Sequence, residues 1–107
     1  MKMKNDIAKN NGDESRFTQN YAVAIRMLRR IDGIVVNPSR YGDSAVIGLF
    51  TEDGECVRFC MTPGGNVSVG FVTKKGFAEP LAVALNVART ISANGNVDIY
   101  LLGGTAK

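Results

Sequence analysis

The sequence predicts an α+β domain: an antiparallel sheet of four or five strands packs against one central helix, and a second, amphipathic helix stands at the N-terminus. Three observations predict it, namely two segments with the helical spacing of apolar residues, three consecutive segments with alternating apolar residues, and turn sequences between them. The expected order is α-β-β-β-α-β, with room for an extra short strand after the first helix. A chain of 107 residues, 45% of them hydrophobic, is sufficient for one domain with its own core.

The N-terminal part of the chain divides into a polar tail and a helix. The polar residues 1–14 are expected to form a flexible tail, and residues 15–107 are expected to form a single domain. Ser15 is the expected N-cap of a helix over residues 16–31. One face of this helix is apolar and the opposite face is basic. The apolar face consists of Phe17, Tyr21, Ala24, Ile25, Leu28 and Ile31, and the opposite face carries Gln19, Arg26, Arg29 and Arg30.

Alternation and turns predict the strands. Residues 34–36 suit a short strand that ends at Asn37-Pro38. Three clearer strands are expected over residues 44–51, 55–62 and 67–73, joined by an Asp-Gly hairpin and a Pro-Gly-Gly-Asn turn. Each of the last two presents an apolar side to the core, and the second of the three carries a small, polar side opposite. The expected core residues are Val57, Phe59, Met61, Val67, Val69 and Phe71, and the polar side carries Cys56, Arg58 and Cys60.

The second predicted helix, residues 79–93, is apolar over more than half of its circumference. We therefore expect it to be the central packing element, and the width of its apolar arc leaves room for a homodimer through this helix. A last strand over residues 97–102 follows it. The expected buried contacts join Leu81, Leu85, Ala88 and Ile91 to Val57, Phe59 and Val69.

No catalytic or metal-binding motif stands out. The chain contains no histidine, which removes the usual triads, most metal sites and the proton shuttle of neutral pH. We expect no enzymatic activity, no cofactor and no metal. Cys56 and Cys60 are four residues apart on a strand, a separation of roughly 13 Å, so they are expected to be reduced thiols rather than a disulfide. Without an apolar N-terminal or membrane-spanning stretch, the cytoplasm is the expected location.

The basic residues offer the candidate binding site. The chain carries a net charge of +3, and six of its basic residues fall into small groups: Arg26, Arg29, Arg30, Arg58, Lys74 and Lys75. One interpretation is a small non-catalytic module that contacts nucleic-acid phosphates. A second is a protein-binding inhibitor or adaptor, of the type that phages and mobile elements encode, which docks on an acidic surface of a larger host complex. A third is a solvated helix face with arginines placed near the helix C-terminus.

Two family resemblances bear on these interpretations. The order helix, three strands, helix over residues 15–93, with Lys74-Lys75 before the second helix, is similar to double-stranded-RNA-binding domains, and implies that the two lysines meet phosphates. The histidine-bearing loop of that family is missing here, and Gly76 and Pro80 interrupt the basic helix start. The stretch from Arg58 to Ile91 also resembles single-strand-binding transcriptional coactivators, in which a curved sheet is followed by Lys-Gly and a helix.

Overall fold

The computed structural model describes residues 16–102, so the predicted tail and the Ser15 cap lie outside the described residues. Its first helix covers residues 16–28, three residues shorter than predicted. The other elements are β1 (Val35–Tyr41), β2 (Ser44–Thr51), β3 (Gly54–Met61), β4 (Val67–Phe71), α2 (Ala78–Ile91) and β5 (Val97–Leu101). The α+β class and the two predicted helices are confirmed. Within residues 16–102, neither helix is long and apolar enough to cross a membrane.

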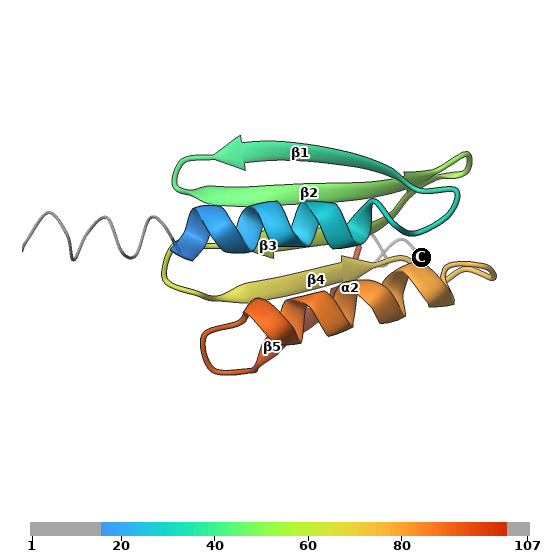
Figure 1. Cartoon of the computed structure of the whole chain (residues 1–107). Helices are drawn as coiled ribbons and strands as arrows, with labels where there is room; N and C mark the ends of the chain where they lie inside the picture. The colour runs from blue at the N-terminus through green and yellow to red at the C-terminus, as the bar shows by residue number, and fades with distance from the viewer. Residues whose placement is uncertain (1–15, 103–107) are drawn as a thin grey trace, which may run out of the picture.

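The five strands form one sheet in the order β1-β2-β3-β4-β5 (Figure 1). The first four pair antiparallel in sequence order, as their short connecting turns require. β5 pairs with β4 in parallel, because α2 carries the chain back along the sheet before β5 begins. The sheet is therefore mixed, with four antiparallel strands and a parallel last strand.

The extra strand is longer than the sequence suggested. β1 continues through Pro38 to Tyr41, and the turn to β2 is made by Gly42 and Asp43. Proline cannot donate a ladder hydrogen bond, which is why Asn37-Pro38 looked like a strand end. An edge strand tolerates it, because only one side of the strand is paired. Four strands thus separate the two helices, in contrast to the three of the double-stranded-RNA-binding layout.

Both helices cover the same face of the sheet (Figure 1). The N-terminal helix contributes Ala24 and Leu28, both fully buried, and α2 contributes Ala84 and Ala88. Between the helices and the strands lies one hydrophobic core, centred on the fully buried Phe59 of β3. Its other strand residues are Ala45, Ile47, Leu49, Cys56, Val57, Met61, Val67 and Val69.

The orientation of α2 differs from the expected one. Ala88 and Ile91 are buried as predicted, but Leu81 and Leu85 are only half-buried at the margin of the core. The face that points inward is instead centred on Ala84, Val87 and Ala88. Small residues at the contact let the helix lie close to the sheet, so its larger leucines are displaced to the flanks.

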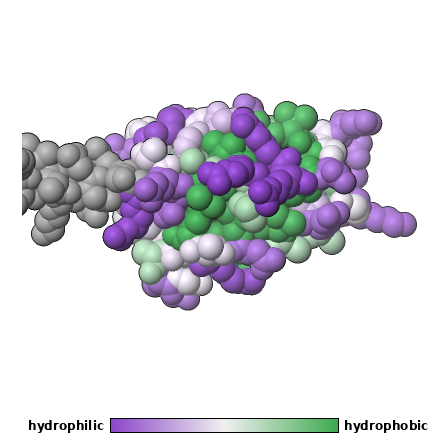
Figure 2. All heavy atoms as spheres, in the orientation of Figure 1, coloured by the Kyte–Doolittle hydropathy of each residue, from purple (hydrophilic) through white to green (hydrophobic). Residues whose placement is uncertain are grey.

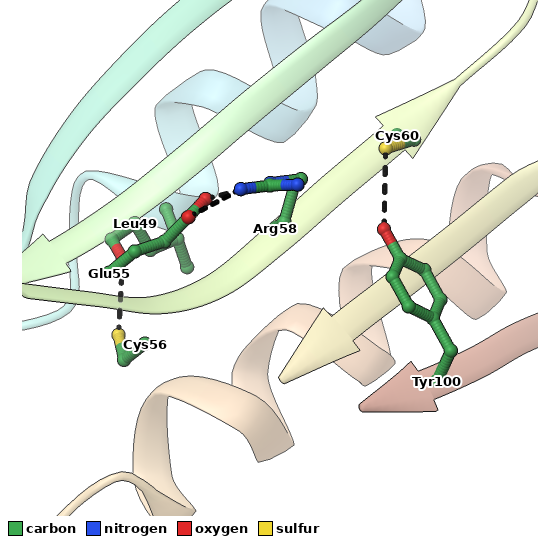
Figure 3. Close-up of polar contacts among 6 residues, drawn as sticks. All are labelled: Leu49, Glu55, Cys56, Arg58, Cys60 and Tyr100. Atoms are coloured by element: carbon green, nitrogen blue, oxygen red, sulfur yellow. Dashed lines mark hydrogen bonds and ion pairs between the residues drawn. The ribbon is translucent and has the colours of Figure 1, made fainter. Parts of the chain in front are cut away.

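Cys56 lies on the side of the sheet opposite to the predicted one. The pairing of β2 with β3 shifts register here: Leu49 is opposite Val57, whereas Phe50 is opposite Glu55. Cys56 is the extra residue of this β-bulge, and its fully buried thiol donates to the carbonyl of Leu49 at 3.3 Å (Figure 3). Alternation alone could not show this, because a bulge resets the period of the strand by one residue.

Candidate functional site

The C-terminal end of the N-terminal helix presents a cationic outer surface, which we call the arginine face: Arg26 lies in the last turn of the helix, and Arg29 and Arg30 follow it. Phe17, Ala24 and Leu28 point into the core, so the three arginines project to solvent as the spacing predicted. Residues 16–30 contain no acidic residue, and the two ion pairs of the described chain involve other side chains. Within residues 16–102 the three arginines therefore form no ion pair, although Asp32 follows Arg30 by two residues.

A shallow apolar strip adjoins the arginine face. Tyr21, Ala22 and Ile25 line an open hollow together with Arg26 and Arg29. Tyr21 and Ile25 are half-buried against the core, so their outer surfaces remain accessible. On the helix side of the molecule, hydrophobic residues surface between the hydrophilic side chains (Figure 2). Apolar and guanidinium groups therefore lie side by side on this helix.

The predicted lysines lie at the same end of the sheet as the C-terminus of the N-terminal helix. The chain continues from the N-terminal helix into β1, whose first residue Val35 pairs with Phe50 next to the β2–β3 turn. Asp53 of the same turn forms an ion pair with Lys74, with 3.4 Å between the carboxylate oxygen and the ammonium nitrogen. The Lys74 ammonium also lies 5.7 Å from the ring centroid of Phe77, the residue that immediately precedes α2. Lys75 is exposed in the same loop. Lys74 is thus engaged within the chain, and Lys75 adds to the positive charge of this end.

Arg58 does not belong with the other five residues. It projects from the face of the sheet that the helices leave uncovered, which we call the open face. There its guanidinium binds the Glu55 carboxylate through two bonds, Nε to Oε2 at 3.0 Å and a terminal nitrogen to Oε1 at 2.7 Å (Figure 3). Hydrogen bonding to the Glu55 side chain, together with the negative charge of Glu55, raises the pKa of Arg58. Arg58 therefore lies on a different surface from Arg26, Arg29 and Arg30.

Two glycines let aromatic rings lie across the open face. A Cβ placed on Gly70 would stand 2.6 Å from the ring of Tyr100, and one placed on Gly48 would stand 2.7 Å from the ring of Phe50. The rings thus occupy the space that the side chain of any residue other than glycine would take at positions 48 and 70. With Tyr41, Arg58 and Cys60, they line a shallow hollow of about 450 Å³.

The polar groups of the open face are nearly balanced in charge. Arg58 is opposed by Glu55 and by the exposed Asp98 of β5. The Tyr100 hydroxyl lies 3.9 Å from the Cys60 thiol (Figure 3). Burial, and then the neighbouring thiol, raise the pKa of Tyr100. The open face is therefore not a phosphate-attracting surface.

The cysteines and acidic residues form no further site in the described part of the chain. Both cysteines are free thiols, as the strand spacing predicted. Burial raises the pKa of the Cys56 thiol, so the reactive thiolate is disfavoured there. No group of three potential metal ligands gathers within residues 16–102.

Comparisons of the chain with protein-family models, with curated proteins and with solved structures find no match. The resemblances noted in the sequence thus receive no support from a matching family or fold. The function has to be argued from the surfaces of the chain itself.

Sequence reasoning identified the polar side of the sheet that carries Arg58 and Cys60, but it missed the aromatic rings that lie across it. Phe50, Tyr41 and Tyr100 fall on three different strands, and their proximity depends on the pairing of those strands. The available signal was glycine within a strand, at Gly48 and Gly70, which marks a close approach of other groups to the backbone.

Proposed function

We propose that this protein is a small, non-catalytic binding module of the cytoplasm that contacts nucleic-acid phosphates through the arginine face of its N-terminal helix. The observation that carries the proposal is the cluster of Arg26, Arg29 and Arg30, which form no ion pair within residues 16–102. Side chains three and four positions apart on a helix are neighbours, about 5–6 Å between Cβ atoms. Guanidinium groups at this spacing suit successive phosphates, each through two parallel hydrogen bonds.

The energetics of the helix favour a polyanionic partner. Arg26, Arg29 and Arg30 are like charges gathered at the C-terminal end of the helix, with Arg29 and Arg30 just after its last residue, so their mutual repulsion costs free energy. The position near the helix C-terminus offsets part of this cost, because cations are favoured there. A partner with regularly spaced negative charges removes the repulsion, and Lys75 at the same end of the sheet extends the contact.

Matched charge variants test this proposal. Replacing Arg26, Arg29 and Arg30 together with Gln is expected to weaken binding to nucleic acid at least tenfold at low salt, without loss of the fold. The control replaces Arg40, Arg58 and Arg89 with Gln, which removes the same charge from other surfaces. If both triple variants lost affinity equally, binding would depend on net charge alone and the assignment to the arginine face would be wrong.

The second candidate is a protein-binding inhibitor or adaptor, and the apolar strip beside the arginines favours it. Tyrosine and arginine are the residues most often found at the energetic centre of protein interfaces. An acidic protein surface with an apolar anchor would engage Tyr21 and Ile25 together with Arg26.

The variant Tyr21→Ala separates the two candidates. Phosphate contacts depend on the arginines, so nucleic-acid binding should fall by less than about threefold. A protein interface instead concentrates its losses in one or two residues. A protein partner that stays bound after nuclease treatment would favour the second candidate, provided that Tyr21→Ala abolishes its binding and Arg58→Ala does not.

A further inference from the structure

β5 is an edge strand with unusually exposed apolar side chains. Within residues 16–102 it pairs with β4 alone, and the core-side residues Ile99 and Leu101 are 50% and 53% exposed. Their partners on β4, Val69 and Phe71, lie in or beside the core. α2 packs over β3 and β4 and reaches β5 only at its margin. The apolar face of the sheet therefore continues past the region that the helices cover.

The other edge of the sheet is protected, and β5 is not. β1 carries Pro38 at its centre, which cannot donate to another strand, and Arg40 two residues later. Proline and charged side chains are the devices by which sheet edges resist pairing. β5 reads Val-Asp-Ile-Tyr-Leu, without proline or lysine and with Asp98 as its one charged residue. This contrast singles out β5 as the edge that can accept a strand.

One hydrogen bond shows which backbone groups of β5 point toward β4 and which point away from the sheet. The Leu102 N–H donates to the Phe71 carbonyl of β4 at 2.8 Å. Because backbone groups alternate along a strand, those of Asp98 and Tyr100 also point toward β4. The N–H and C=O groups of Val97, Ile99 and Leu101 then point away from the sheet. The residues with exposed apolar side chains thus also carry the unpaired backbone groups.

We propose that β5 pairs antiparallel with β5 of a second copy of this chain, about a two-fold axis that is perpendicular to the sheet and passes midway between the two copies of Ile99. In this register Ile99 faces Ile99 of the second copy, and Val97 faces its Leu101. All of these are hydrogen-bonded pairs, which exchange both N–H···O bonds. The two five-stranded sheets become one, and the apolar side chains of both edges cover each other.

The charges of the strand fit a second copy in this register. Asp98 lies opposite Tyr100 of the second copy, so no like charges stand directly across from each other. Pairing of β5 with the β1 edge instead would meet Pro38 and would build an open chain of molecules rather than a closed dimer. This interface differs from the homodimer through the second helix that the sequence suggested.

Sedimentation of the full chain with matched edge variants tests the proposal. The wild type is expected at twice the 11.5 kDa mass of the chain. Ile99→Lys should shift it to the monomer, since a charge on an edge strand opposes pairing. Val35→Lys is the control, because Val35 is 66% exposed on the opposite edge, and it should leave the dimer intact. Circular dichroism checks that both variants fold.

A disulfide tests the register. Residues of a hydrogen-bonded antiparallel pair have Cα atoms about 5.5 Å apart, within the range that a disulfide spans. In a Cys60→Ser background, Ile99→Cys should therefore form a cross-linked dimer under mild oxidation, and Val35→Cys should not. A monomeric wild type at high concentration, or a dimer unchanged by Ile99→Lys and not cross-linked through Ile99→Cys, would overturn the proposal.

Discussion

Glu55 and Arg58 lie on the same face of β3 although they are three residues apart in the strand, and their side chains form a two-bond ion pair. Regular alternation would place them on opposite faces. The bulge at Cys56 brings them together, because it adds one residue between Glu55 and Val57 and turns that residue into the core. The ion pair is thus a consequence of the bulge, and it fixes the guanidinium on the open face.

The Glu55–Arg58 pair is expected to add little stability. Arg58 is 45% exposed, and exposed ion pairs contribute about 0.2–1 kcal/mol. A double-mutant cycle with Glu55→Gln and Arg58→Gln, measured by urea unfolding, should give a coupling in that range that shrinks at high salt. A coupling free energy above about 2 kcal/mol would contradict this account, because it would mean that the ion pair is shielded from water.

Gly70→Ala should destabilise the fold by about 1–3 kcal/mol, the usual effect of forcing an extra methyl into filled space. The new Cβ would stand 2.6 Å from the Tyr100 ring and 2.8 Å from a Leu102 methyl. In a Tyr100→Ala background the same change should cost less, because the ring is gone. Equal costs in both backgrounds, by thermal unfolding, would show that the ring does not lie across Gly70.

Phe59 and Leu85 should respond very differently to truncation. Phe59 is fully buried between the sheet and the helices, so Phe59→Ala is expected to cost about 3–5 kcal/mol. Leu85 lies half-buried on the flank of α2, and Leu85→Ala should cost under about 2 kcal/mol. Denaturant midpoints measure both. A larger loss at Leu85 would mean that α2 is rotated toward the orientation that its sequence suggested.

The two thiols should react at different rates. Cys60 is partly accessible on the open face, whereas Cys56 is buried and its pKa is raised, which lowers its thiolate fraction at a given pH. Iodoacetamide followed by peptide mass spectrometry should label Cys60 at least tenfold faster. Cys56 should react only as fast as the protein opens, and faster labelling of Cys56 would contradict the bulge.

Tyr100 should link stability to alkaline pH. Burial raises its pKa in the folded state, so the neutral phenol favours folding. For an acid whose folded pKa is raised, this contribution is present below the unfolded pKa and is lost as pH rises through the folded pKa. Tyr100→Phe should therefore unfold less readily than wild type above about pH 10, the ordinary tyrosine value. Tyr41→Phe, at an exposed position, is the control, and identical pH profiles for all three proteins would contradict this account.

The elements whose sequence signals are local were predictable. Ser44–Thr51 was predicted to the residue, because its alternation is followed by the Asp-Gly turn. The exposure of Arg26, Arg29 and Arg30 was also predictable from the helical spacing, although the helix ends at residue 28 and the last two follow it. β1 was underestimated, because Pro38 is compatible with a strand only when that strand lies at an edge. Edge position is a property of the sheet and is absent from the local sequence.

Features that depend on pairing could not be predicted from the sequence. The inward position of Cys56 requires a register shift relative to β2, and the separation of Arg58 from the other basic residues requires that both helices cover one face. The half-burial of Leu85 depends on which side of a broadly apolar helix meets the sheet. In each case the sequence allows two arrangements, and tertiary packing selects one.

The salt dependence of nucleic-acid binding tests the role of the arginine face most directly. Wild type and the Arg26, Arg29 and Arg30 to Gln variant are titrated with single- and double-stranded DNA and RNA at several salt concentrations. Each lost phosphate contact removes about 0.7–0.9 from the slope of log affinity against log salt, so the triple variant should lose about 2–3. Equal slopes for the two proteins, or no binding of wild type to any of the four at low salt, would contradict the proposal.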